Sequence, residues 1–284
     1  MIPATFEYAR ARTMAQALQA VASPDVKVVA GGQTLIPLLR FRLTSPRRLV
    51  DISGLTQLKG IRRTPAGLRI GAASTYRDLL DSRLVQTDAP LIAEVTEQVG
   101  DRQVRNLGTI GGGLAHADPA SDMPAVMVAL EATFNLLSQQ GGKRAVPARE
   151  FFTGAFTTAM RPDELLVDIV VPKAPRGAGT AYISFEQPAS GYALTAAAAL
   201  VVKSKGTITH AALAFTGLAD RAFAVDCAPL IGTSGDPRTV DGVAERSVEG
   251  VEPNDDIHAS AEYRLHLAKV AARRALATAI ARAK

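Results

Sequence analysis

The chain has 284 residues, of which 47% are hydrophobic, so it can bury one large core or two modest ones. Its net charge of +5 is mild for this length, and it has no Trp and few other aromatic residues. These values argue against a basic, aromatic platform for nucleic acid, so we expect no nucleic-acid partner. The positive net charge is at least as compatible with a basic surface that faces an acidic partner subunit.

The sequence contains a single cysteine, Cys227, which excludes a disulfide within the chain. Because an iron–sulfur cluster needs about four thiolate ligands, this chain cannot hold one alone. The histidines lack the spacing of known metal sites, so we expect no metal site. Residues 1–7 do not resemble a signal peptide, and no run approaches the roughly 20 apolar residues of a membrane span. We therefore expect a cytoplasmic protein with no membrane span.

In chain order, the first elements are a helix, a strand, a glycine turn and the start of a second helix. Residues 13–21 have a helical period, and residues 26–29 form a short buried strand. That strand leads into Ala30-Gly31-Gly32-Gln33-Thr34, after which residues 35–39 begin a helix. This order directs free N–H groups and the positive end of a helix dipole toward an anion.

The middle of the chain combines strands and helices with a second glycine turn. We expect strands over residues 49–52, 68–72, 133–137 and 164–171, and a helix over 91–99. The second turn is Thr109-Ile110-Gly111-Gly112-Gly113, and the loop over 117–121 then leads to a helix that Ser121 or Asp122 caps.

After residue 171 the pattern changes to that of an antiparallel sheet. Residues 172–179, rich in Pro and Gly, are the best candidate for a linker. Strands over 182–186, 193–202 and 207–216 follow, and a long final helix carries Tyr263, Leu267, Val270 and Ala271 on one face.

The two glycine turns are the most informative motifs. Neither matches the G-x-G-x-x-G fingerprint or the G-x-x-x-x-G-K-[ST] phosphate loop, and either one alone is typical of an ordinary turn. Each pairs a hydroxyl, that of Thr34 or Thr109, with bare backbone amides, a combination that suits phosphate oxygens. If the fold brings the two turns together, they form one pyrophosphate site.

Four residues outside these turns each have two interpretations. Asp122 is either a helix cap or a carboxylate that accepts a hydrogen bond from a ribose or ribityl hydroxyl. Lys27 either offsets pyrophosphate charge or is merely solvated, and His116 either makes a local hydrogen bond or has no role. Tyr192 either packs against its neighbours or lies against a flavin ring. No Ser–His–Asp arrangement is evident, so we assign no catalytic residue.

Nearly the whole chain resembles the FAD-binding medium subunit of the molybdenum hydroxylases, the family of xanthine dehydrogenase and carbon monoxide dehydrogenase. Residues 27–37 resemble the family's first pyrophosphate loop. Residues 105–113, followed by Asp118-Pro119-Ala120-Ser121-Asp122-Met123-Pro124, resemble its second loop. Residues 255–264 resemble a stretch near the end of the bacterial members.

The resemblance implies FAD as the cofactor and suggests which residues contact it. It places Asp122 on a hydroxyl of the flavin side chain and Tyr192 against the isoalloxazine. The other candidates are Lys27, Ala30, Gly31, Gly32, Gln33, Thr34, Leu35, Thr109, Ile110, Gly111, Gly112, Gly113, His116, Asp118 and Leu166. The chain departs from the family at Gln33-Thr34, where His-Ser or Thr-Asp is common, and at Gly113, where Asn or Ser is common. Binding would then depend more on backbone N–H groups.

The resemblance also implies the fold and the partners. It predicts an α+β protein in which a two-part FAD-binding domain of the PCMH type, residues 1–175, precedes a smaller α+β domain with a three-stranded antiparallel sheet, residues 176–284. A small subunit with two [2Fe-2S] clusters and a large subunit with the molybdenum cofactor would complete a dimer of heterotrimers. In that oxidoreductase, this chain would take electrons from the clusters and pass them to an external acceptor.

Two other functions stay open on the sequence alone. A flavin-free structural or assembly subunit of such a complex is favoured by Gln33 and Gly113 and opposed by the intact Thr34, Thr109 and Asp122. A self-contained flavin oxidase is opposed by the lack of a distinct substrate domain and of a catalytic base.

Overall fold

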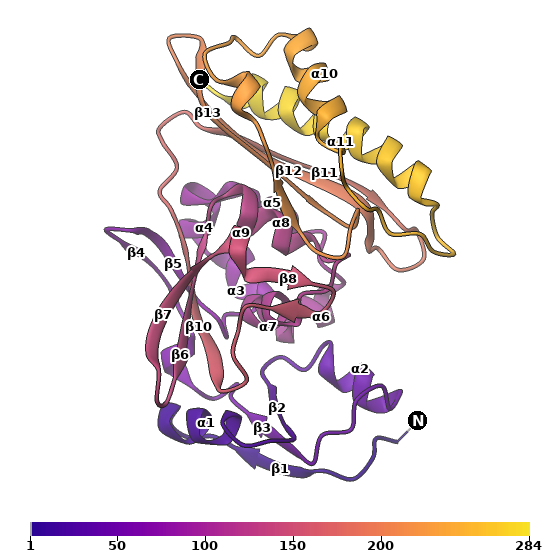
Figure 1. Ribbon diagram of the computed structural model, residues 1–284. Helices are drawn as coiled ribbons and strands as arrows, with labels where there is room; N and C mark the ends of the chain where they lie inside the picture. Colours follow the sequence, from indigo (N-terminus) through magenta and orange to yellow (C-terminus); the bar gives the residue numbers. More distant parts are fainter. Residues whose placement is uncertain (1) are drawn as a thin grey trace.

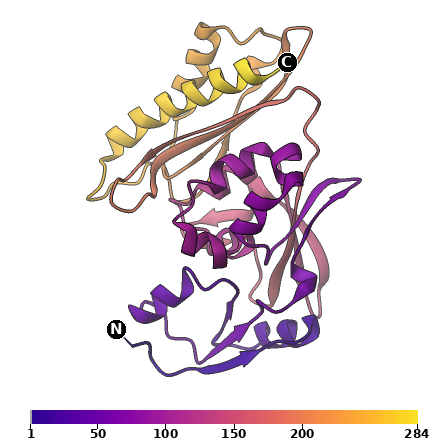
Figure 2. The same cartoon turned by 180° about the vertical axis from the view of Figure 1, so that it is seen from behind.

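The computed structural model describes residues 2–284, which form three stacked units (Figure 1). A small N-terminal unit lies at one end and a C-terminal unit with the longest helix lies at the other. A sheet with its covering helices lies between them. Figure 2 shows the same stacking from behind, with the two chain ends far apart.

The N-terminal unit is a small parallel sheet with two helices. Its strands, in order across the sheet, are β1 (Glu7–Arg10), β3 (Arg48–Asp51) and β2 (Val26–Val29). Helix α1 (Met14–Val21) connects β1 to β2, and Thr13 caps it by accepting a hydrogen bond from the amide of Gln16. Helix α2 (Leu35–Arg40) follows the first glycine loop, as the sequence predicts.

The central unit is built on a five-stranded antiparallel sheet. Its strands, in order, are β4 (Ile61–Thr64), β5 (Gly67–Gly71), β10 (Glu164–Val171), β6 (Thr133–Ser138) and β7 (Gly142–Pro147). Strand β10 lies between β5 and β6 although it follows both in sequence, so it joins the two halves of the sheet. The core includes Phe134, Phe151 and Phe152, whose rings meet edge to face.

Short helices lie beside this sheet (Figure 1). They are α3 (Tyr76–Asp81), α4 (Arg83–Asp88), α5 (Pro90–Thr96), α6 (Arg102–Leu107), α7 (Ile110–His116), α8 (Asp122–Ala129) and α9 (Ala148–Phe151), the last followed by the hairpin of β8 (Phe152–Gly154) and β9 (Thr157–Thr158). All of these helices except α6 contribute buried residues to the unit's core. The helix expected over 91–99 is α5, which ends earlier, at Thr96. Gly100 follows shortly after in the left-handed region, with φ of 51°.

The second glycine segment is the beginning of helix α7 rather than a turn, so that prediction was wrong. Thr109 caps the helix, because its hydroxyl accepts a hydrogen bond from the amide of Gly112 at 3.1 Å. Glycine is a poor helix former. Close packing explains its use at Gly111, where an added β-carbon would lie 2.5 Å from the β-carbon of Ala72.

The C-terminal unit is an antiparallel sheet. Its strands, in order, are β11 (Gly179–Glu186), β12 (Ala193–Ser204), β13 (Thr207–Thr216) and β14 (Phe223–Val225). The three long strands are those predicted. The fourth, β14, is an added edge strand, and its three residues are too few to show an alternating pattern.

Two helices complete the C-terminal unit. Helix α11 (Ala261–Arg282) packs along β11 and β12, and α10 (Pro237–Arg246) packs beside α11. The buried face of α11 contains Leu267 and Ala271, as predicted, but also Arg264. Tyr263 was predicted on this face, yet it is exposed.

The C-terminal unit packs on the central unit through α5 and α8, which contact strands β11 to β14. Residues 172–178 connect β10 to β11 without a helix or strand, and the domain boundary at 175/176 stays a prediction. Within residues 2–284, none of the helices has the length and apolar character that a membrane crossing requires.

Candidate functional site

The first glycine loop, residues 30–34, presents unpaired hydrogen-bond donors. Within residues 2–284, the backbone amides of Gly31, Gly32, Gln33 and Thr34 donate no hydrogen bond. Gly32 has φ of 73°, a conformation that favours glycine, and the Gln33 side chain braces the loop by donating to the carbonyl of Gly31 at 3.2 Å. Backbone amides need partners when they leave water, so this loop suits the oxygens of an anion.

The amides of the second glycine segment are already paired, contrary to the expectation of bare donors. Those of Ile110 and Gly111 donate to the carbonyls of Ser74 and Ala72, at 3.1 and 2.9 Å. Those of Gly112 and Gly113 both donate to Thr109, to its hydroxyl and its carbonyl. The Thr109 hydroxyl accepts one bond and keeps its own hydrogen to donate. This segment therefore offers a hydroxyl donor and the exposed backbone of Gly112.

Contacts at glycines bring the two segments together. A β-carbon added to Gly31 would lie 2.0 Å from the carbonyl oxygen of Leu107 and 2.8 Å from the α-carbon of Gly108. The first loop therefore lies directly against the residues that precede Thr109. A β-carbon at Gly113 would lie 2.5 Å from the hydroxyl oxygen of Tyr76, so that tyrosine fills the space of the side chain that Gly113 lacks.

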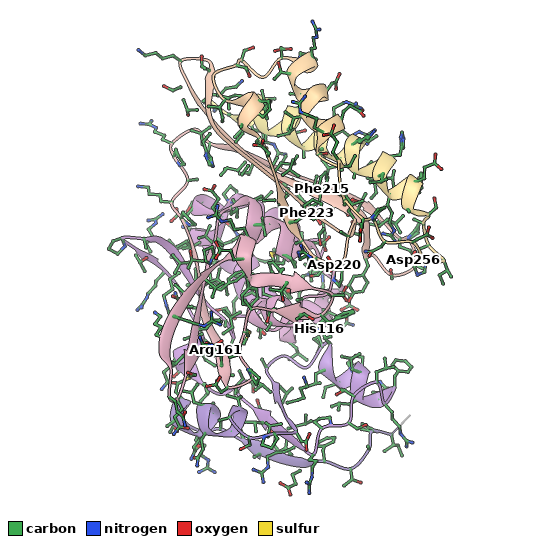
Figure 3. The ribbon with its side chains drawn as sticks, in the orientation of Figure 1. His116, Arg161, Phe215, Asp220, Phe223 and Asp256 are labelled. Atoms are coloured by element: carbon green, nitrogen blue, oxygen red, sulfur yellow. The ribbon has the colours of Figure 1, made fainter. Side chains whose placement is uncertain are left out.

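Lys27 and His116 come from different units and lie near each other. Figure 3 shows His116 on the side of the central unit that faces the N-terminal unit. Burial, with a smaller effect from the Lys27 charge, lowers the pKa of His116 and so favours its uncharged ring. The ring lies 5.0 Å from that of Phe156. Asp118 opposes this shift, and its carboxylate accepts a hydrogen bond from the amide of Ala120 at 3.0 Å.

Asp122 accepts a hydrogen bond from a tyrosine instead of capping helix α8. Ser121 occupies the cap position without a side-chain bond, and the Tyr182 hydroxyl donates to Asp122 Oδ1 at 2.6 Å. Burial raises the pKa of Asp122 to about 6, although the Tyr182 bond opposes the increase. Sequence reasoning missed Tyr182, because nothing local to β11 indicates a partner 60 residues earlier.

Tyr192 directly precedes β12 and is close enough to Asp118 and Asp122 for their charges to act on it. The residue is 50% exposed, and burial together with the charges of Asp118 and Asp122 raises its pKa. The structure thus brings together the first loop, Thr109, Asp118, Asp122 and Tyr192. Leu166 does not share this exposure, since it is buried in the core of the central unit.

This arrangement fits a cofactor that carries phosphate, hydroxyl groups and a flat ring. The free amides of residues 31–34 fit phosphate, the carboxylate of Asp122 fits a hydroxyl donor, and the half-exposed ring of Tyr192 fits stacking. The fold and the site therefore define a two-domain α+β protein that binds a nucleotide-type cofactor.

Comparisons with known proteins identify the family. Residues 4–174 match the FAD binding domain in molybdopterin dehydrogenase, and residues 180–279 match the CO dehydrogenase flavoprotein C-terminal domain. The chain is 35% identical to the carbon monoxide dehydrogenase medium chain of Hydrogenophaga pseudoflava, over 99% of both chains. It is 39% identical to the glyceraldehyde dehydrogenase medium chain of Sulfolobus acidocaldarius, over 95% of this chain and 96% of the relative.

A solved structure agrees with these matches along the whole chain. The carbon monoxide dehydrogenase from Hydrogenophaga pseudoflava that lacks the Mo-pyranopterin moiety superimposes with a TM-score of 0.97, at 36% identity and 100% coverage of both chains. The chain belongs to the molybdenum hydroxylase family, in which it is an FAD-binding medium subunit of an oxidoreductase. The expected family, fold and cofactor are confirmed.

We predict that Gly32→Val and Gly112→Val each weaken FAD binding by roughly tenfold or more, equivalent to about 1.4 kcal/mol. At Gly32 the branched side chain strains a positive φ and meets Ile36, and at Gly112 its β-carbon lies 2.8 Å from the capping Thr109 hydroxyl. Fluorescence titration of the flavin-free chain with FAD measures the effect. Gly206→Val is the matched control, because Gly206 has a similar φ of 82° with nothing within 4 Å. Retained affinity in both variants would contradict the assignment.

We predict that Asp122→Asn stabilises the flavin-free chain at pH 7.5 by up to about 3 kcal/mol, and that the gain disappears below about pH 4. The carboxyl of Asp122 loses its proton at a lower pH in the unfolded chain than in the folded chain. Above about pH 4, ionisation therefore lowers the free energy of unfolding of the wild type. Asparagine does not titrate and still accepts the Tyr182 bond. Denaturant unfolding at several pH values measures the difference. A difference that does not change with pH would contradict the raised pKa.

Proposed function

We propose that this chain is the subunit through which electrons leave a multi-subunit molybdenum hydroxylase. In this proposal it takes electrons from the [2Fe-2S] clusters of a small partner subunit and passes them to an external acceptor. The bound FAD supplies the redox chemistry, and the protein supplies its position and electrostatic surroundings. The single observation that supports this role most strongly is the convergence of free amides, Asp122 and the half-exposed Tyr192 at the junction of the units.

The other residues of the chain fit a role in cofactor binding better than one in substrate chemistry. Asp122 is engaged by the Tyr182 hydroxyl, and the His116 ring packs 5.0 Å from that of Phe156, near the charge of Lys27. Cys227, the only thiol, is buried, and burial raises its pKa to about 12, so it is a poor nucleophile or metal ligand. These properties favour an electron carrier over a self-contained flavin oxidase.

We propose that residues 30–35 and 109–113 hold the FAD pyrophosphate, with Lys27 and His116 nearby. Asp122 would accept from a hydroxyl of the flavin side chain, Tyr192 would lie against the isoalloxazine, and Asp118 would shape the loop between them. Leu166 would support this region only from the core. The free amides, the Thr109 hydroxyl and the close approach at Gly31 support this assignment.

We also propose two partner subunits, a small iron–sulfur subunit and a large molybdenum subunit, in a dimer of heterotrimers in the cytoplasm. The relatives are named as medium chains, which supports a three-part assembly. Relatives named for carbon monoxide and for glyceraldehyde match this chain at similar identity. That similarity supports a substrate pocket in another subunit.

The test is the flavin spectrum of the chain purified alone and with both partner subunits. We expect about one FAD per chain, since the site has one set of donors. In the full complex, a substrate screen with carbon monoxide and aldehydes should bleach the flavin absorbance anaerobically. The same screen should leave the flavin of the chain alone oxidised.

Two outcomes would contradict the proposal. A colourless chain that cannot be reconstituted with FAD would support a flavin-free assembly subunit. Oxidation of an organic substrate by the isolated flavin-loaded chain would support a self-contained oxidase. A complex prepared without the iron–sulfur subunit is the matched control, because the flavin in it should stay oxidised when substrate is added.

A further inference from the structure

Residues 255–264 resemble a family stretch, yet they lie outside the cofactor-binding loops. They form the loop before helix α11 and its first turn, and Ser260 caps the helix by accepting from the amide of Tyr263 at 3.2 Å. Asp256 lies beside the start of α11 (Figure 3). Its Oδ1 accepts from the amides of His258 and Ala259, at 2.9 and 3.1 Å. The loop is thus shaped around one carboxylate, whose other oxygen is left for a further partner.

That partner is Arg264, an arginine whose residue surface is only 4% exposed. Its Nη2 donates to Asp256 Oδ2 at 2.8 Å. Its Nη1 donates to two backbone carbonyls, that of Leu194 and, at 3.0 Å, that of Gly217. A buried guanidinium requires such partners because its desolvation is costly. One side chain therefore joins α11 to the start of β12 and to the turn after β13.

Gly217, and Ala193 next to Leu194, also hold the loop before Asp122 through their backbone amides. The amide of Gly217 donates to the carbonyl of Pro119 at 2.7 Å, and the amide of Ala193 donates to that of Ala120 at 3.3 Å. The Thr216 hydroxyl lies within hydrogen-bond distance of two carbonyls of the same loop, 2.8 Å from Pro119 and 2.7 Å from Ser121. The loop from Asp118 to Asp122 is therefore supported from behind by residues 193 and 216–217.

Tyr192 is connected to the same support. It directly precedes Ala193 and lies two residues before Leu194, whose carbonyl Arg264 binds. A displacement of Leu194 or Gly217 would move the ring of Tyr192 and the carboxylate of Asp122 together. Tyr192 and Asp122, which the proposed function places against the flavin ring and its side chain, are thus both linked through backbone hydrogen bonds to one buried arginine on α11.

We propose that Arg264 is a positioning residue that sets the placement of Tyr192 and of the Asp118–Asp122 loop against the bound FAD. This inference rests on the proposed function, because it concerns the same cofactor site. Arg264 acts through the carbonyls of Leu194 and Gly217, with Asp256 as its counter-ion. Lysine carries the same charge, but its single nitrogen cannot reproduce the fork that spans these three acceptors.

The test compares Arg264→Lys with Arg273→Lys in the FAD-loaded full chain. Arg273 lies on the same helix and pairs with Asp241 and Glu245 at the surface, so it controls for the loss of an ion pair on α11. The measurements are the FAD dissociation constant, the flavin absorption spectrum and the flavin midpoint potential, all far below the unfolding temperature. We expect Arg264→Lys to weaken FAD binding roughly tenfold and to shift both the spectrum and the potential. Arg273→Lys should leave all three as in the wild type.

A second pair of variants tests the same support without touching the buried charge. Thr216→Val removes the hydroxyl that bonds Pro119 and Ser121 while keeping the side-chain shape. Thr209→Val is its control on the same strand, because Thr209 bonds only Val202 within β12. We expect Thr216→Val to shift the flavin potential in the same direction as Arg264→Lys. Thr209→Val should not shift it.

Unchanged FAD affinity, spectrum and potential in Arg264→Lys and Thr216→Val, with only a lower unfolding temperature, would overturn the positioning role. In that case the flavin-loaded wild type would still support the proposed function. A wild-type chain that binds no FAD would overturn both the proposed function and this inference.

Discussion

The site depends first on the close contact between Gly31 and the carbonyl of Leu107. No side chain fits there, since even a β-carbon would lie 2.0 Å from that oxygen. The contact places the free amides of residues 31–34 beside Thr109, although the two segments belong to different units and lie far apart in sequence. In the proposed function, the approach of the two segments joins these free amides and the Thr109 hydroxyl into one pyrophosphate site.

Donors and acceptors in this site come from different parts of the chain. The N-terminal unit supplies free amides and Lys27, whereas the carboxylate of Asp122 is held by Tyr182 of the C-terminal unit. Tyr192 also belongs to the C-terminal unit. A cofactor bound across this junction would contact all three units, including the second domain, which lacks the glycine loops.

Local sequence patterns predicted most of the helices and strands. The contacts that complete the site join residues far apart in sequence, and these patterns do not show them. The strand over 26–29, the loop after it and the three long C-terminal strands follow from period and glycine placement alone. The helix at Ile110 could not be predicted, because packing against Ala72 outweighs the weak helix propensity of three glycines. Tyr182 and Arg264 were missed for a related reason. Their partners are 60 and 70 residues away, and no local signal records such a contact.

The most direct test of this account is the FAD affinity of Gly31→Ala, measured by calorimetry on the flavin-free chain. The added methyl group must separate the first loop from Leu107, so we expect FAD binding to weaken roughly tenfold or more while the circular dichroism spectrum is retained. Gly242→Ala is the control, since a β-carbon there meets only the Arg246 guanidinium, at 3.6 Å. Wild-type affinity in Gly31→Ala would contradict the claim that this contact creates the cofactor site.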